Sequence, residues 1–201
     1  VAPEKAEHRP DAIIPSRVFT PQGTFIKNLS PRLKEIGKIK IGKKGSKTTT
    51  SGHKLPVKFD HFEVTGIMRD EATGDFLLDP LMQQLGESPK ELNVMFLYND
   101  PTLIFSTRYN AYKGGKCQCS GDGITARNLQ DEDIPCNPDT CKAYQEKACK
   151  KNGILSCILT DSPRLGGVYK FRTTSHNSID SILSSLIFFH TLTGGVLAMV
   201  P

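Results

Sequence analysis

Tryptophan is absent from this sequence, and only 7% of its 201 residues are aromatic. Hydrophobic residues nevertheless make up 37% of the chain and charged residues 23%, which are ordinary values for a folded globular protein. A chain of this length is also long enough to bury a core of its own. The shortage of aromatic residues therefore does not exclude a folded protein, and we expect one.

The signatures of several common enzyme classes are missing as well. The chain has no His-Glu-x-x-His motif, which excludes the usual zinc protease pattern. Residues 120–123 (SGDG) lack the Gly-Lys-Ser/Thr ending of a phosphate-binding loop and are better explained as a turn. No Ser-His-Asp or Cys-His arrangement can be argued from the residues. The sequence therefore gives no indication of an enzyme.

Patterns typical of export and of membrane insertion are also lacking. The first residues are polar and no apolar segment follows them, so we expect a cytoplasmic protein. Residues 179–200 approach the length of a membrane span, but Asp180, His190 and Gly194 interrupt the apolar stretch. We predict a packed helix there, and no contact with a membrane.

Cysteine is what the sequence does concentrate, because all six cysteines fall between residues 117 and 157. Without export, clustered cysteines favour a metal over disulfides. Structural zinc sites are tetrahedral and commonly use four thiolates. We predict a structural zinc ion bound by Cys119, Cys136, Cys141 and Cys149, with Cys117 as the alternative for the first ligand.

Two other interpretations of the cysteines stay open: free, partly buried thiols, or disulfides in an exported protein. Cys157 differs from the other five because it lies in the apolar run at residues 154–159, and we predict that it belongs to the core. His176 is the histidine downstream of the cysteines. Its polar surroundings indicate a surface residue beside a helix cap rather than a metal ligand.

Apolar patterning predicts an α+β fold with a mostly antiparallel sheet. Period-two alternation at residues 36–42 predicts a half-buried strand with isoleucines on one face and lysines on the other. Further strands are expected at residues 57–64, 92–97, 154–159, 168–173 and 196–200, and a short helix after Asp79. Residues 103–112 fit a strand or a helical turn.

Helical spacing begins after Ser175 and predicts a C-terminal amphipathic helix. Its packed stripe is expected to consist of Ile179, Ile182, Leu183, Leu186, Phe189 and Leu192. In domain terms, we predict an irregular, proline-containing arm at residues 1–30 and a single α+β domain at residues 31–201. This domain would include a cysteine-rich, zinc-binding insertion at residues 116–150, bounded by strand-like runs.

Positive charge is concentrated near the start of the predicted domain. Residues 34–47 hold six lysines against one glutamate, in a chain whose net charge is +5. Such a surface can contact phosphates or an acidic partner. We predict partner or DNA contacts by Lys38, Lys40, Lys43, Lys44 and Lys47, the alternative being that these lysines are only solvated. Tyr109, Tyr112 and Tyr169 would add base stacking if the partner is a single-stranded nucleic acid.

Four segments carry a family resemblance when they are taken in order. They are SPRLKEIGKIKIG at residues 30–42, LPVKFDHF at 55–62, KCQCSGDG at 116–123 and TSHNSI at 174–179. In this order and spacing the chain resembles the recombination directionality factor-like proteins that accompany large serine integrases in phages. The resemblance covers residues 30–200 or nearly so.

The resemblance implies an accessory protein that is not an enzyme. It would bind a large serine integrase on DNA and switch it from integration to excision, so that attL recombines with attR. It also implies a bacterial host cell, no small-molecule substrate, and metal binding by Cys119, Cys136, Cys141 and Cys149. The competing functions are direct binding of single-stranded nucleic acid in phage or mobile-element metabolism and, with less support, a metal-dependent hydrolase.

Overall fold

The computed structural model describes residues 33–48, 54–164 and 166–200, without the side chains of residues 44, 46–48, 54 and 56. The predicted arm at residues 1–30 lies outside this description. Within it, ten strands are present: β1 (Glu35–Thr48), β2 (Lys54–Arg69), β3 (Phe76–Leu78), β4 (Val94–Met95), β5 (Phe105–Lys113), β6 (Lys116–Gly121), β7 (Thr125–Asn128), β8 (Asp133–Pro135), β9 (Cys149–Leu159) and β10 (Val168–Thr173). The helices are α1 (Met82–Leu85), α2 (Pro101–Ile104), α3 (Lys142–Gln145) and α4 (His176–Leu192).

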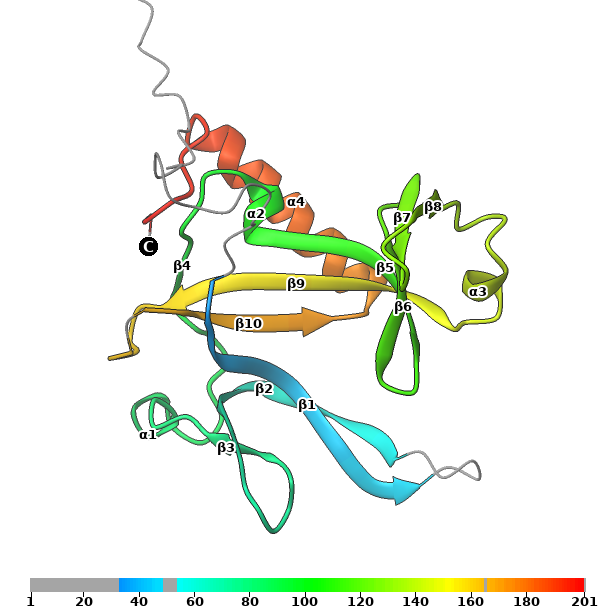
Figure 1. Cartoon of the computed structure of the whole chain (residues 1–201). Helices are drawn as coiled ribbons and strands as arrows, with labels where there is room; N and C mark the ends of the chain where they lie inside the picture. The colour runs from blue at the N-terminus through cyan, green and yellow to red at the C-terminus, as the bar shows by residue number, and fades with distance from the viewer. Residues whose placement is uncertain (1–32, 49–53, 165, 201) are drawn as a thin grey trace, which may run out of the picture. The chain divides into compact units, whose positions relative to one another are not determined.

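The strands form one mixed sheet with the order β3-β2-β1-β10-β9-β5-β6-β7-β8, and β4 pairs separately with β9. Among these named strands, β1 and β10 run parallel and every other pair is antiparallel. Figure 1 shows β9 and β10 side by side at the centre. The predicted class, a mostly antiparallel sheet with a C-terminal helix, is confirmed.

The segment predicted as a cysteine-rich insertion extends the sheet. Its strands β6, β7 and β8 continue the sheet beyond β5. Each of these strands is short, at six, four and three residues, and they are separated by tight turns. Segments this short carry too little alternation for a period-two pattern to be recognised, which explains why the sequence did not predict them.

Strand β1 confirms the predicted alternation, since Ile39 is buried while Lys38 and Lys40 point to the opposite face. The strand is longer than expected, because it continues to Thr48, beyond the predicted end at residue 42. At the other end of the chain, the strand expected at residues 196–200 is reduced to a single bridge between Ala198 and Phe96.

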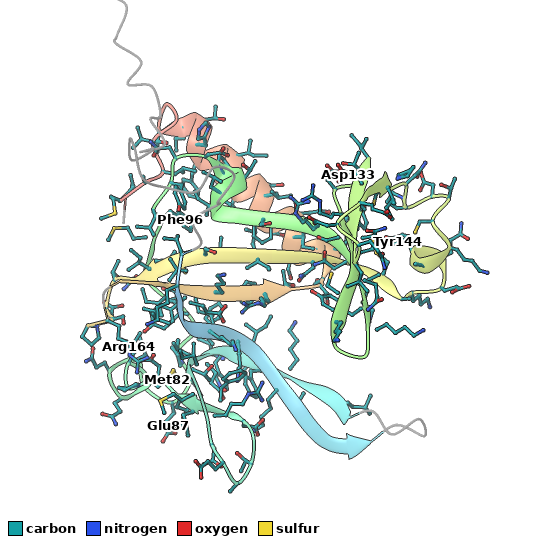
Figure 2. All side chains as sticks on the ribbon, in the orientation of Figure 1. Met82, Glu87, Phe96, Asp133, Tyr144 and Arg164 are labelled. Carbon is teal, nitrogen blue, oxygen red and sulfur yellow. The ribbon has the colours of Figure 1, made fainter. Side chains whose placement is uncertain are left out.

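The core lies in two clusters. The first joins β1, β2, β9 and β10 through Ile39, Val64, Leu81, Cys157, Leu159 and Tyr169. The second joins α4 to β5 through Ile104, Phe105, Ile179, Leu186 and Leu197. Phe96, labelled in Figure 2, packs against both clusters. The core position predicted for Cys157 is thereby confirmed.

A glycine in the central strand β9 allows the second cluster to close. A side-chain carbon at Gly153 would come within 2.5 Å of the Phe105 ring and 3.1 Å of Ile179. Such a contact is too short for real atoms, so any larger residue would separate α4 from the sheet. The absence of a side chain here lets the Phe105 ring lie against the backbone.

Helix α4 begins at the Ser175 cap, whose side chain accepts a hydrogen bond from the Ser178 backbone N–H at 3.4 Å. Gly194 and Gly195, both with positive φ, follow its end. Ile179 and Leu186 are buried as predicted, but the predicted packed stripe is wrong at Phe189 and Leu192, which are 52% and 69% exposed. In the described part of the chain, no helix is long and apolar enough to cross a membrane.

A buried polar network supports the first core cluster. The Tyr169 hydroxyl donates to Asp79 Oδ2 at 3.1 Å and lies 2.8 Å from Ser162 Oγ. The same Asp79 carboxylate accepts from the Leu81 backbone N–H and pairs with Arg164 at 3.3 Å. Burial, followed by the Asp79 charge, raises the pKa of Tyr169. Asp79 therefore has hydrogen-bond partners on each side, although it is only 2% exposed.

Replacing Tyr169 by phenylalanine removes one of these partners from a buried carboxylate. We expect Tyr169→Phe to lower the free energy of unfolding by about 1–2 kcal/mol, measured by urea denaturation. Tyr112→Phe is the matched control, because Tyr112 is 55% exposed, and it should change stability by less than about 0.5 kcal/mol. Equal stability of the two variants would contradict the role of the network.

Candidate functional site

The sheet brings two of the predicted zinc ligands to one face. Ala111 on β5 pairs with Cys119 of β6 on one side and with Cys149 of β9 on the other. Directly opposed residues in antiparallel strands project to the same face, so both thiols lie on the Ala111 side. The two cysteines are two strand spacings apart, about 10 Å.

Cys136 reaches the same region from the segment after β8. Its backbone N–H donates to Ile124 at 2.8 Å, and its Sγ lies so close to Gly121 that a side-chain carbon there would be 2.6 Å away. Cys141 is the cap residue of α3. The need for glycine at residue 121 was not predicted, because it depends on a contact between segments that are distant in sequence.

The causes of the pKa shifts separate five of the cysteines from the sixth, Cys157. Burial first, and then the nearby thiols of Cys141, Cys119, Cys136 and Cys117, raise the pKa of Cys149 to about 11. The pKa of Cys119 is also raised, by burial and then by three of the same neighbours. In contrast, burial alone raises the pKa of Cys157 to about 12. Five thiols therefore lie within electrostatic range of one another, and the sixth stands apart in the core.

The described cysteines are all free thiols. Soft sulfur donors suit zinc, but in the arrangement described, no group of three Cys, His, Asp or Glu side chains is close enough to share an ion. Cys117 is further engaged by a hydrogen bond from its Sγ to the Cys119 carbonyl at 3.3 Å. The donors thus match zinc in kind, and zinc binding would require the sulfurs to approach one another.

Two lysines of the predicted basic surface, Lys38 and Lys40, are paired within the chain. Lys38 lies 3.3 Å from the centre of the Phe76 ring and 3.8 Å from Glu35, and burial lowers its pKa. Lys40 pairs with Glu63 at 3.9 Å. These contacts join β1 to its neighbours, so they account for both lysines without an external partner.

Of the three other predicted lysines, the structure describes the side chain of Lys43. Lys43 is exposed, with its Nζ 5.8 Å from the Phe59 ring. The side chains of Lys44 and Lys47 lie outside the description. Strand β10 adds two cations, Lys170 and Arg172, which both pair with Glu35. Their alternation was visible in the sequence, but the parallel pairing that places them beside β1 was not.

Two of the three tyrosines proposed for base stacking are buried or packed against another aromatic ring. Tyr169 is fully buried in the core and cannot stack on a base. Tyr109 makes an edge-to-face contact with Tyr144, with ring centres 5.5 Å apart. Of the three, Tyr112 is the one with a largely exposed ring. A stacking platform for single strands normally needs several such rings, and these three do not form one.

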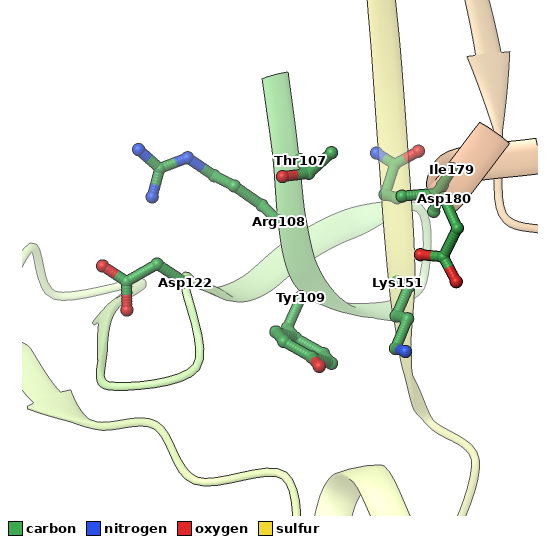
Figure 3. Close-up of a pocket in the computed structure, with 8 residues that line it drawn as sticks. Thr107, Arg108, Tyr109, Asp122, Lys151, Ile179 and Asp180 are labelled. Atoms are coloured by element: carbon green, nitrogen blue, oxygen red, sulfur yellow. The ribbon is translucent and has the colours of Figure 1, made fainter. Parts of the chain in front are cut away.

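A polar depression of about 170 Å³ lies where α4 begins (Figure 3). Thr107 and Arg108 leave β5 on opposite sides, and Tyr109, Lys151 and Asp180 line the space between the elements. His176 lies 3.1 Å from Lys151 Nζ and 3.3 Å from Asp180 Oδ2. His176 is therefore a surface residue directly after a helix cap, as predicted.

Comparison with known proteins gives one family. The model of the Gp3-like family, described as recombination directionality factor-like, matches residues 36–201. This match covers most of the chain, including the whole sheet and α4. No curated protein matches the chain, and no solved structure does.

The separation of Cys157 from the other cysteines can be tested by alkylation. With a chelator present at about pH 8, iodoacetamide should leave Cys157 unmodified in the folded chain, since the thiol is buried and thiolate is scarce when the pKa is so high. Half-buried Cys141 should react. Mass spectrometry of digested samples measures both, with the urea-unfolded chain as control. Similar rates for Cys157 and Cys141 in the folded chain would contradict this assignment.

Proposed function

Because the chain belongs to the recombination directionality factor-like family, we propose that it binds a large serine integrase on DNA and switches the integrase from integration to excision. The observation that carries this proposal is the family match over residues 36–201. The family consists in general of accessory factors without catalysis of their own. The chemistry of strand exchange would therefore belong to the integrase.

Such a factor acts by differential binding. It must bind the integrase arrangement that joins attL to attR more tightly than the one that joins attP to attB, because equal affinity for both would shift nothing. Moving an equilibrium from 1:99 to 99:1 requires a difference of about 5.5 kcal/mol. A preference of this size needs a substantial contact surface, which favours protein docking over a few isolated ion pairs.

Direct binding of single strands has less support. Tyr169 is buried, Tyr109 is packed against Tyr144, and Lys38 and Lys40 are paired with carboxylates of the same chain. Of the described groups expected to contact bases and phosphates, Lys43 and Tyr112 remain exposed. Exposed Lys43 can still add a phosphate contact beside an integrase that is already on DNA.

A structural zinc ion is part of the same proposal. Cys119, Cys136, Cys141 and Cys149 would hold it, with Cys117 as the alternative first ligand. An ion at this place would tie β6, the segment between β8 and α3, and the start of β9 together. Its support is the gathering of five thiols on three separate segments and the free state of every one of them. A closed site of four sulfurs would be structural rather than catalytic.

The functional proposal is tested by recombination in vitro with the serine integrase encoded in the same phage or prophage. Adding the chain should raise attL × attR recombination from near zero to most of the substrate and inhibit attP × attB. The chain without integrase, and heat-denatured chain with integrase, are the controls. Unchanged product ratios with folded chain would overturn the proposal.

The zinc proposal predicts about one zinc per chain after purification without chelator, measured by elemental analysis. Removing the metal should cost about 3 kcal/mol or more, which lowers the melting temperature of a chain of this length by about 6–12 °C. Cys141→Ser should lose the metal, and comparison of Cys119→Ser with Cys117→Ser identifies the first ligand, since the variant that lacks that ligand should lose the metal and the other should retain it. A metal-free chain with the same melting temperature as the purified protein would contradict the proposal.

A further inference from the structure

The second half of α4 exposes apolar side chains on the side that is polar in the first half. In the first half, the side facing away from the sheet carries Asp180 and the serines at residues 181, 184 and 185. In the second half, apolar residues replace them on the same side. The apolar side of a helix normally faces the core, yet these side chains are exposed. We define the C-terminal apolar surface as Ile187, Phe188, Phe189, Leu192, Val196 and Met199, which are 57, 61, 52, 69, 48 and 61% exposed.

This surface is held in place by the structure itself. Beyond α4, Leu197 is buried, and the backbone N–H groups of Leu197 and Ala198 donate to Asn99 Oδ1 at 3.0 and 2.8 Å. The Met199 N–H donates to the Phe96 carbonyl at 2.8 Å. The segment after the helix is thus fixed beside α2, next to the end of α4 (Figure 1). A surface that is already ordered loses little entropy when a partner binds.

The surface is large enough to form the apolar part of a protein interface. A phenylalanine side chain offers about 150–250 Å², so Phe188 and Phe189 together expose roughly 200 Å². The other four apolar side chains bring the total to roughly 500 Å², near the upper end of the largest patch on a typical monomer. One side of a standard protein interface is about 800 Å². The exposed area is therefore sufficient for the apolar centre of such an interface.

The charge pattern restricts the partner. Residues 181–201 contain no Asp, Glu, Lys or Arg, although the chain as a whole has a net charge of +5. DNA is excluded as the occupant, because binding to a phosphate backbone requires cations. The matching surface must itself be uncharged and apolar. Because the surface is a ridge along one helix, the apolar face of a helix or a groove between two helices fits it.

We infer that the C-terminal apolar surface is the face that docks on the integrase, against an apolar helical surface of that partner. This inference rests on the proposed function, which requires a contact with the integrase but does not say where it lies. The basic strand is a poorer candidate, since Lys38 and Lys40 are already paired inside the chain. The C-terminal apolar surface, in contrast, exposes six large apolar side chains in a segment without Asp, Glu, Lys or Arg.

The test measures binding of the full chain to the immobilised integrase of the same phage or prophage by biolayer interferometry. The double variant Phe188→Gln, Leu192→Gln should bind at least ~30-fold more weakly than the unaltered chain, as expected for apolar residues central to an interface. Met68→Gln is the matched control, because Met68 is 70% exposed on β2 and outside the surface, and its affinity should change less than about threefold. Affinity should also change little between ~0.1 and ~0.5 M salt, since the contact is not ionic.

The outcomes separate the inference from the proposed function. If the unaltered chain binds and the double variant binds equally well, the inference is overturned and the proposed function stands. If the unaltered chain does not bind the integrase at all, the proposed function fails and the inference with it. Light scattering measures self-association. If the unaltered chain is a dimer and the double variant is a monomer with the same integrase affinity, the surface binds a second copy of the chain and the inference is overturned.

Folding of the variants is checked by thermal unfolding, and the midpoint should move by no more than a few degrees because both side chains are exposed. If the double variant unfolds, Ile187→Gln with Met199→Gln replaces it, since both positions belong to the same surface and are 57% and 61% exposed. Unchanged affinity in this second pair would likewise overturn the inference.

Discussion

Strand β9 hydrogen-bonds to β5 along one edge and to β10 along the other, and the rest of the structure depends on this double pairing. Its last residue, Leu159, belongs to the first core cluster. Its first residue, Cys149, belongs to the thiol cluster, by which we mean Cys117, Cys119, Cys136, Cys141 and Cys149. Between them, Gly153 admits the Phe105 ring against which α4 packs. One strand thus connects the thiol cluster, the two core clusters and the helix.

The thiol cluster shows how burial and charge combine. Burial and neighbouring thiols both raise the pKa of Cys149, because each opposes the formation of a thiolate. Without a cation, Cys149 and Cys119 are therefore expected to stay protonated at neutral pH. A divalent cation would reverse this preference by stabilising several thiolates at once. The same sulfur atoms can therefore bind either protons or a metal ion, but not both at once.

The two candidate contact surfaces differ in whether their side chains have partners within the chain. The lysines of β1 have carboxylates and an aromatic ring of the same chain as partners, so their charge is used in holding strands together. The apolar side chains at the end of α4 have no comparable counterpart among the described residues. Water is a poor environment for them, which makes this end of the helix the place where a partner gains most by binding.

Local patterns in the sequence were sufficient to predict the alternation in β1, the start and course of α4 and the core position of Cys157, and to reveal the family resemblance. Each of these depends on residues close together in the chain. The tertiary structure alone decided that Tyr169 is buried, that Lys38 and Lys40 are paired, and that β6, β7 and β8 continue the sheet. It also decided that Phe189 and Leu192 are exposed although they follow the helical period of the packed residues. In each of these cases the environment is set by strands or segments that are distant in sequence, and no local periodicity encodes which of them become neighbours.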